Sequence, residues 1–277
     1  MMLNSQSLKL SKAQVMAIVN LTPDSFYAQS RNLTLEAVRA SVERAIAEGA
    51  TIVDLGGYSS RPGAEDVSLE EEWRRVRMGL EAVRSVDGEV VVSIDTFRSE
   101  VVRRAYEEFG DFIVNDISAG EMDDEMLSTV AHYGLLYVAM HMRGVPQTMQ
   151  SLNDYESGVV SGVEEYFKLR TEELIAAGIA PEKIILDPGF GFAKSPEQNY
   201  ELLMSLQRIV SLGYPVLVGL SRKSMIYKPL GLSAEDALPG SLALAWESLR
   251  AGAKIVRVHD VAPTRQIVDL YNHYNRA

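Results

Sequence analysis

The sequence has 277 residues, a formal net charge of −11, 47% hydrophobic residues and no cysteine. A chain of this length can bury a large core, and its acidity, with no basic run, argues against binding to nucleic acid or to an anionic membrane. The lack of cysteine excludes disulfides, thiolate metal sites and a cysteine nucleophile. Residues 1–14, which we expect to be an N-terminal extension, lack the apolar core of a signal peptide. No apolar run reaches the ~20 residues of a membrane span, so a soluble, cytoplasmic protein is expected.

Short apolar runs rich in β-branched residues alternate with amphipathic stretches along the rest of the chain. The runs predict strands at residues 15–21, 51–57, 90–96, 112–118, 135–142, 184–187, 215–221 and 254–261. The stretches predict helices at residues 34–49, 68–85, 99–109, 123–133, 156–178, 196–212, 234–251 and 263–274. Strict alternation implies a parallel sheet, and this number of units predicts an α/β fold of the (β/α)₈ TIM-barrel class, with residues 15–277 as a single domain.

Polar residues gather at one end of the predicted strands. They occupy the last strand positions or the first position beyond: Asn20, Asp54, Asp95, Asn115, Asp116, His141, Asp187, Ser221, Arg257 and His259. The carboxyl ends of parallel strands meet on one face, so we expect a single site built from many loops. The stretch 184–194, IILDPGFGFAK, delivers Asp187 into a glycine-rich turn between strand and helix. Taken alone, an aspartate that caps this turn explains the stretch equally well.

Cationic residues follow the last two predicted strands. Lys223 and Arg222 come directly after Ser221, and Arg257 lies on the same side of its strand as His259 because strand side chains alternate. The loops after strands seven and eight of such barrels commonly bind phosphate, so these cations predict a phosphate or diphosphate site. The alternative is that Arg257 and Asp260 are members of structural ion pairs.

Acidic and amide residues form a second group, with Asp54, Asp95 and Asp187 beside Asn20 and Asn115. Such groups can accept hydrogen bonds from a heterocycle rich in N–H donors or neutralise a cation as it forms. A ring of carboxylates can also bind a divalent metal. The sequence leaves these possibilities open.

Motifs at the strand ends carry a family resemblance. In chain order they are NLTPDSF, DLGGYSSRPGA, SIDTFRSEV, VNDISAG, HMRGVPQTMQ, LDPGFGFAK, VGLSRKSMI and RVHDV. Together, over residues 15–270, they resemble the dihydropteroate synthase family of the folate pathway. The resemblance implies condensation of (7,8-dihydropterin-6-yl)methyl diphosphate with 4-aminobenzoate to give 7,8-dihydropteroate and diphosphate. It also implies Mg²⁺ as cofactor and a homodimer.

The resemblance also implies roles for individual residues. Asn20 would ligate the Mg²⁺ carried by the diphosphate, and Arg257 would stack on the pterin ring. The residues implied in catalysis are Asp95, Asp187, Lys223, Arg257 and His259. The residues implied in substrate binding are Ser60, Arg61, Pro62, Asp95, Asn115, Met140, Asp187, Phe192, Gly219, Ser221, Lys223, Arg257 and His259. Of these, Arg61, Pro62 and Ser221 would border the aminobenzoate site, which sulfonamide drugs also occupy.

Three features depart from the family pattern. Ser60 stands where threonine is usual, Tyr58 replaces a frequent glutamate, and the first loop reads SFYAQSRN where a Ser-Asp-Gly-Gly turn is common. The first loop and Ser60 belong to the loops at 22–32 and 59–66, and Tyr58 directly precedes the second of these loops. The altered first loop supports one alternative to a synthase, a noncatalytic pterin-binding paralogue. A second alternative is a barrel of the methyltetrahydrofolate methyltransferase type, although such a barrel has no need of the cations of the SRK and RVH segments. The fold alone allows a third, a phosphate-binding sugar isomerase barrel.

Overall fold

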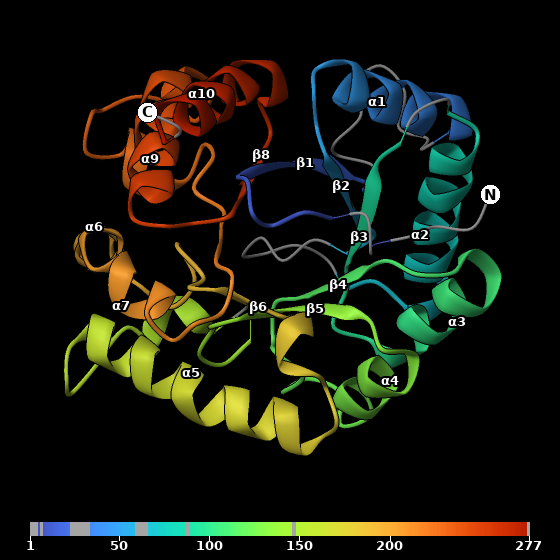
Figure 1. Ribbon diagram of the computed structural model, residues 1–277, viewed down its shortest axis with the longest axis horizontal. Helices are drawn as coiled ribbons and strands as arrows, with labels where there is room; N and C mark the ends of the chain where they lie inside the picture. The colour runs from blue at the N-terminus through green and yellow to red at the C-terminus, as the bar shows by residue number, and fades with distance from the viewer. Residues whose placement is uncertain are drawn as a thin grey trace.

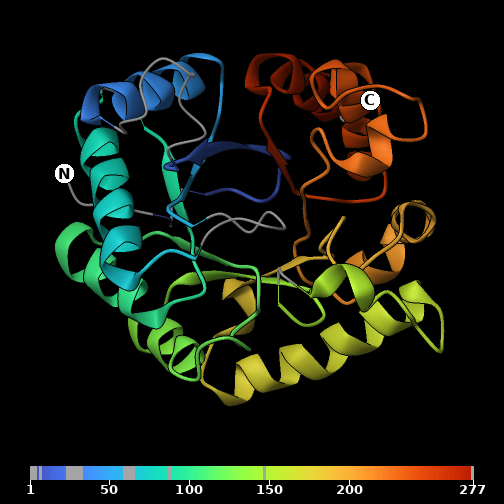
Figure 2. The ribbon, with the colours of Figure 1, turned by 180° about the vertical axis from the view of Figure 1, so that it is seen from behind.

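The computed structural model describes residues 5, 8–22, 34–58, 66–86, 89–145 and 148–275. Its strands run parallel in the order β6-β5-β4-β3-β2-β1-β8-β7, and the helices form a ring around them (Figures 1 and 2). A bridge between Leu186 and Val216 links the two outer strands, so the sheet is a nearly closed barrel. The predicted TIM-barrel class is confirmed.

The strands are short, as barrel strands usually are. Their bounds are β1 (Gln14–Asn20), β2 (Ile52–Gly56), β3 (Val91–Asp95), β4 (Ile113–Asp116), β5 (Leu136–Met140), β6 (Ile184–Asp187), β7 (Leu217–Val218) and β8 (Ile255–Val258). β7 is much shorter than the predicted run at 215–221. The reason is a turn at its end, where Lys223 N donates to Leu220 O and Arg222 adopts a left-handed φ of 55°.

The helices follow the predicted alternation. They are α1 (Leu35–Ala47), α2 (Leu69–Arg84), α3 (Ser99–Phe109), α4 (Met126–Tyr133), α5 (Val159–Ala176), α6 (Pro196–Met204), α7 (Leu206–Val210), α8 (Ser224–Tyr227), α9 (Leu238–Arg250) and α10 (Val261–Tyr274). Short 3₁₀ turns are η3 (Met149–Ser151), η4 (Pro181–Lys183) and η5 (Glu235–Ala237). The predicted helix 196–212 is interrupted at Ser205, and α8 was not predicted. Among the described helices, none is long and apolar enough to cross a membrane.

The inside of the barrel is divided into an apolar lower half and a polar upper half. The lower half consists of Met16, Ile52, Val91, Ile113, Leu136, Val138, Ile185, Leu217 and Ile255. Leu8 and Leu10 pack against this layer, so part of the predicted N-terminal extension contributes to the core. Side chains alternate along a strand, so Asp54 and Arg257 face inward two residues beyond Ile52 and Ile255. A layer of buried apolar side chains therefore lies beneath the charged residues.

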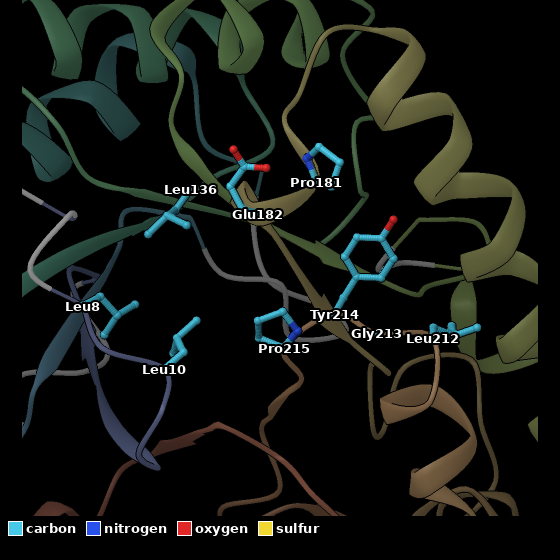
Figure 3. Close-up of a pocket in the computed structure, with 9 residues that line it drawn as sticks. All are labelled: Leu8, Leu10, Leu136, Pro181, Glu182, Leu212, Gly213, Tyr214 and Pro215. Atoms are coloured by element: carbon cyan, nitrogen blue, oxygen red, sulfur yellow. The ribbon is translucent and has the colours of Figure 1, made fainter.

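A hollow of 620 Å³ opens at the opposite end of the barrel from these charges (Figure 3). Leu8 and Leu10 form one side, and residues 212–215 before β7 form another. Leu136 and Pro181 precede or begin neighbouring strands, which places the hollow at the amino ends of β5, β6 and β7. The strand-end polar residues are therefore not part of it.

Candidate active site

Arg257 of β8 joins two carboxylates across the mouth of the barrel. Its Nε donates to Asp54 Oδ2 at 2.6 Å, and its Nη2 donates to Asp95 Oδ2 at 2.8 Å. Asp54 is fully buried and also accepts a bond of 3.1 Å from Asn115 Nδ2. Burial disfavours the charged guanidinium, but the two carboxylates outweigh it and raise the pKa of Arg257. Arg257 is therefore a permanent cation between a fixed and a more accessible partner.

Asp95 is the more accessible of these partners, with 19% of its side chain exposed. Burial raises its pKa to about 7, Arg257 opposes that rise, and the nearby negative charge of Asp54 adds to it. The carboxyl group consequently changes protonation near neutral pH. An acid of this kind, in a site bordered by other charges, is a candidate for chemistry.

Asp187 and Lys223 form a second pair of opposite charges. Asp187 Oδ1 accepts a bond of 2.8 Å from Gly189 N, and burial raises the pKa of Asp187 against the influence of Lys223. Burial lowers the pKa of Lys223 to about 8, and Asp187 opposes that shift. Lys223 Nζ donates to Phe190 O and lies 4.8 Å from the ring centroid of Phe192. The glycine-rich turn thus brings an acid, a cation and an aromatic face together.

An apolar wall lines the mouth beside these charges. Its buried members are Phe97, Ile117, Met140, Met142, Met149 and Ala193, with Tyr58, Met122 and Phe192 packed against them. The Tyr58 ring meets Phe97 edge-on at 5.1 Å, and its hydroxyl donates to Asp66 Oδ1 at 3.3 Å. Tyr58 therefore supports the wall where the family often has a glutamate. A flat heterocycle with polar edges fits a site that pairs such a wall with carboxylates.

Asn20, His259 and Ser221 lie around the ends of β1, β7 and β8. Asn20 and His259 border one hollow of 190 Å³. The His259 backbone N donates to Ser221 Oγ at 3.2 Å, and its Nδ1 lies 3.1 Å from the same hydroxyl. A Cβ added to Gly219 would lie 3.8 Å from Arg257 Cβ, so this glycine is adjacent to the guanidinium's own stem. His259, Ser221, Gly219 and Arg257 therefore lie close together, and the hollow that Asn20 shares with His259 also borders α1.

Arg222 does not join them. Its Nε and Nη2 both donate to Asp260 at 2.8 Å, and its Nη1 donates to the carbonyls of Ala234 and Glu235. Asp260 is thus in a structural ion pair, but with Arg222, and Arg257 is paired within the site. The predicted residues Ser60, Arg61 and Pro62 lie outside the described residues, as does the first loop beyond Thr22.

Sequence reasoning placed Asp54 near the site without recognising it as the buried partner of Arg257. It also gave no role to Lys194, the last residue of LDPGFGFAK, which is buried against His141. Strand alternation could have shown that Asp54 faces the inside of the barrel, because it puts Asp54 on the same side of β2 as Gly56. Asp54 Oδ1 and Ser93 Oγ, both buried, have no hydrogen-bond partner within the described part of the chain.

Comparisons with known proteins decide the family. The model of the pterin binding enzyme family matches residues 16–259. Dihydropteroate synthase of Haemophilus influenzae is 42% identical over 268 residues, which cover 97% of this chain and 96% of that protein. The Escherichia coli synthase is 44% identical, with 93% and 90% covered. The chain belongs to the dihydropteroate synthase family. Its members transfer a pterinylmethyl group, and this chain is a transferase of that kind.

Solved structures of the family have the same fold as this chain. A Yersinia pestis dihydropteroate synthase with a sulfonamide drug complex has a TM-score of 0.91 at 36% identity, with 100% of each chain covered. A Xanthomonas albilineans dihydropteroate synthase in complex with 7,8-dihydropteroate has a TM-score of 0.86 at 35% identity, covering 98% of this chain and 96% of that one. Another structure of the Xanthomonas enzyme holds 4-aminobenzoic acid. These relatives therefore favour a dihydropteroate synthase over a methyltransferase or a sugar isomerase.

Proposed function

We propose that this chain condenses (7,8-dihydropterin-6-yl)methyl diphosphate with 4-aminobenzoate at the mouth of the barrel, releasing diphosphate and 7,8-dihydropteroate. The observation that carries the proposal is the position of Arg257, which reaches both Asp54 and Asp95 from the strand end that also presents His259. Arg257 thus lies between the carboxylates proposed to bind the pterin ring and the strand end proposed to bind the diphosphate. The substrate needs these two subsites side by side, because its diphosphate is attached to the pterin through a single methylene group.

The chemistry needs electrostatic stabilisation more than it needs a base. The bond between the methylene carbon and the diphosphate oxygen breaks first, because the electron-rich dihydropterin delocalises the cation that forms. Arg257 and His259, with Arg61, stabilise the departing diphosphate, while Asp95 and Asp187 stabilise the cationic pterin. The neutral amine of aminobenzoate then attacks the methylene carbon, and the ammonium that forms loses its extra proton to solvent. An arylamine is already nucleophilic, so no dedicated general base is required.

We assign Asn20 to the Mg²⁺ that accompanies the diphosphate. A Cβ built on Gly56 would lie 3.7 Å from Asn20 Oδ1 and 3.9 Å from Asp95 Oδ2, so both oxygens border one space at the mouth. The described residues contain no group of three His, Cys, Asp or Glu able to hold a metal. A single protein oxygen such as Asn20 Oδ1 fits Mg²⁺, which commonly takes one or two protein oxygens and completes its shell with phosphates and water. When bound, the ion supplies positive charge to the leaving group.

A product assay tests the proposal. The wild-type chain is incubated with the dihydropterin diphosphate and Mg²⁺, with and without 4-aminobenzoate, while diphosphate release is followed and the product mass is measured. Release together with the mass of dihydropteroate is the expected result. Tight pterin binding without that product would identify the noncatalytic paralogue instead and would refute the proposal.

We also propose a homodimer and a cytoplasmic location. The absence of cysteine from the sequence is compatible with a reducing compartment. Light scattering after size exclusion tests the dimer, because a monomer of this chain has a mass of 30.6 kDa. A mass that stays at the monomer value at micromolar concentration would refute it.

A further inference from the structure

Lys194 is a buried cation that the mechanism above does not use. Only 4% of the residue is exposed, and its ammonium contacts three acceptors. The distances from Nζ are 3.0 Å to Gly189 O, 3.0 Å to Phe192 O and 2.9 Å to His141 Nδ1. An ammonium has three N–H donors, so this set uses all of them. His141 must accept through Nδ1 and is therefore neutral, with its proton on Nε2.

The lowered pKa of His141 agrees with this geometry, whereas burial works against the charge of Lys194 and lowers the pKa of that group well below its usual value. Burial and the neighbouring charge of Lys194 lower the pKa of His141 well below its usual value, which keeps the imidazole neutral. Burial also lowers the pKa of Lys194, against the attraction of Asp187. A buried amine is costly unless its hydrogen bonds are complete, so the three acceptors explain why a lysine is tolerated here.

The three acceptors all belong to the frame around Asp187. Gly189 donates its N–H to Asp187 Oδ1 at 2.8 Å, and His141 donates its N–H to Asp187 O at 2.9 Å. Lys194 Nζ bonds both to the main-chain oxygen of Gly189 and to the ring of His141, and so links the two residues. Through Phe192 O it also fixes the residue whose ring faces Lys223. Both ends of the turn at 188–193 are thus held by one ammonium.

The turn needs such support because its backbone is strained and closely packed. Ala193 has a left-handed φ of 49°, which is unfavourable in a residue other than glycine and persists only where the surroundings enforce it. Gly189, at φ 66°, approaches so closely that an added Cβ would lie 2.0 Å from His141 O. Lys194 follows Ala193 directly, and its Nζ bonds to Phe192 O just before Ala193 and to Gly189 O.

We propose that Lys194, with neutral His141, is a positioning residue for the reaction: it holds the turn at 188–193 so that Asp187, Phe192 and Lys223 meet the pterin. The inference rests on the proposed function, and it further assigns Phe192 and Lys223, with Asp187, to the pterin subsite. It predicts that losing the ammonium weakens use of the pterin substrate specifically. The aminobenzoate site, bordered by Ser221, is not held by Lys194.

The first test compares Lys194→Met with Arg170→Met. Arg170 provides a matched control because its guanidinium also holds the carbonyl of a left-handed alanine, Ala119, but in the loop after β4 and away from Lys223. For Lys194→Met we expect the KM for the pterin diphosphate to rise about tenfold or more, with the KM for aminobenzoate changed by less than about twofold. Arg170→Met should lower the Tm and leave both KM values in place.

A chemical rescue separates the ammonium from a general loss of fold. The sequence has no cysteine, so Lys194→Cys carries the only thiol of the chain. The variant is alkylated in denaturant with 2-bromoethylamine, which restores an ammonium on a side chain of lysine length, or with iodoacetamide, which adds a neutral amide, and is then refolded. Wild-type protein taken through the same steps is the reference. We expect the aminoethyl form to recover the pterin KM and the amide form not to recover it.

The outcomes are distinct. Equal recovery with both reagents, or a Lys194→Met variant that loses Tm like Arg170→Met while both KM values stay unchanged, would overturn the proposal. If the alkylated chains do not refold, the two methionine variants decide the question alone. Failure of the proposed function would look different, because the wild-type chain would then give no dihydropteroate in any of these assays.

Discussion

Asp54→Asn tests the charge arrangement around Arg257. The amide oxygen can take the place of Oδ2 and keep the bonds from Arg257 and Asn115, while the amide nitrogen takes the place of the unpaired Oδ1. The substitution then removes charge and little else. Because Arg257 stays charged, its bond to the amide keeps one charged partner, so only part of the about 1.5–3 kcal/mol that a hydrogen bond to a charged group contributes is lost. We therefore expect the free energy of unfolding to fall by about 1–2 kcal/mol.

The same substitution should shift the pH dependence of the reaction. Asp95, whose pKa is about 7, is ionised above that pH and protonated below it, so kcat/KM should fall as the pH drops through 7. The charge of Asp54 contributes to the raised pKa of Asp95, so Asp54→Asn lowers it. Asp54 and Asp95 lie on either side of the Arg257 guanidinium, and the repulsion between their charges is worth roughly 1–2 kcal/mol. Removing it should lower the pKa of Asp95, and with it the acid limb of the profile, by about one pH unit.

Profiles of kcat/KM from pH 5 to 9, with urea unfolding at pH 7.5, give both quantities. Asp123→Asn is the control, since this carboxylate caps Ser99 at the start of α3 and does not influence Asp95. It should cost about 1 kcal/mol of stability and leave the acid limb in place. Asp187 also has a raised pKa, but Asp54 is not among its causes. An acid limb that stays near pH 7 in Asp54→Asn would therefore refute the assignment of that limb to Asp95.

Three further substitutions address the rest of the site. Asp95→Asn should slow turnover by about 10²-fold while diphosphate binding, measured by calorimetry, stays within about threefold; wild-type turnover would remove its role in stabilising the cation. Because the pKa of Lys223 is about 8, its charge is present below that pH and lost above it, so pterin affinity should fall through pH 8 in the wild type and show no such limb in Lys223→Met. Gly189→Ala should lower the free energy of unfolding by about 3 kcal/mol or more, since its Cβ would lie 2.0 Å from His141 O. Gly213→Ala is the control for backbone strain alone, because Gly213 has a φ of 91° and an added Cβ would have nothing within 4 Å; it should lower the free energy of unfolding clearly less.

The sequence allowed the barrel, and the face of the site, to be predicted because both depend on local patterns. Apolar runs mark strands, and the strict alternation with helices requires them to be parallel. Once the strands are parallel, residues such as Asp95 and Asp187 at their carboxyl ends must meet. The eighth strand was predicted at 254–261 and observed at Ile255–Val258, so even its boundaries differ by few residues.

What could not be predicted depends on contacts between distant parts of the chain. The partner of Arg257, Asp54, is 203 residues away, and the two meet because β8 pairs with β1, which in turn pairs with β2. The direction of Arg222 depends on its left-handed φ, which sequence rules reserve mainly for glycine and asparagine. For that reason the prediction that Ser221, Arg222 and Lys223 form one anion site was wrong for Arg222, which faces Asp260 instead.

The unequal partners of Arg257 have a functional consequence. Asp54 is fully buried and also bound to Asn115, so it is the more firmly held of the two carboxylates. Asp95 is partly exposed and holds Arg257 through Nη2 alone. A pterin whose N–H groups bond to Asp95 competes for that carboxylate, and each bond it gains weakens the hold on Nη2. The freed donor is then available to an anion attached to the same pterin, which would couple recognition of the ring to recognition of its diphosphate.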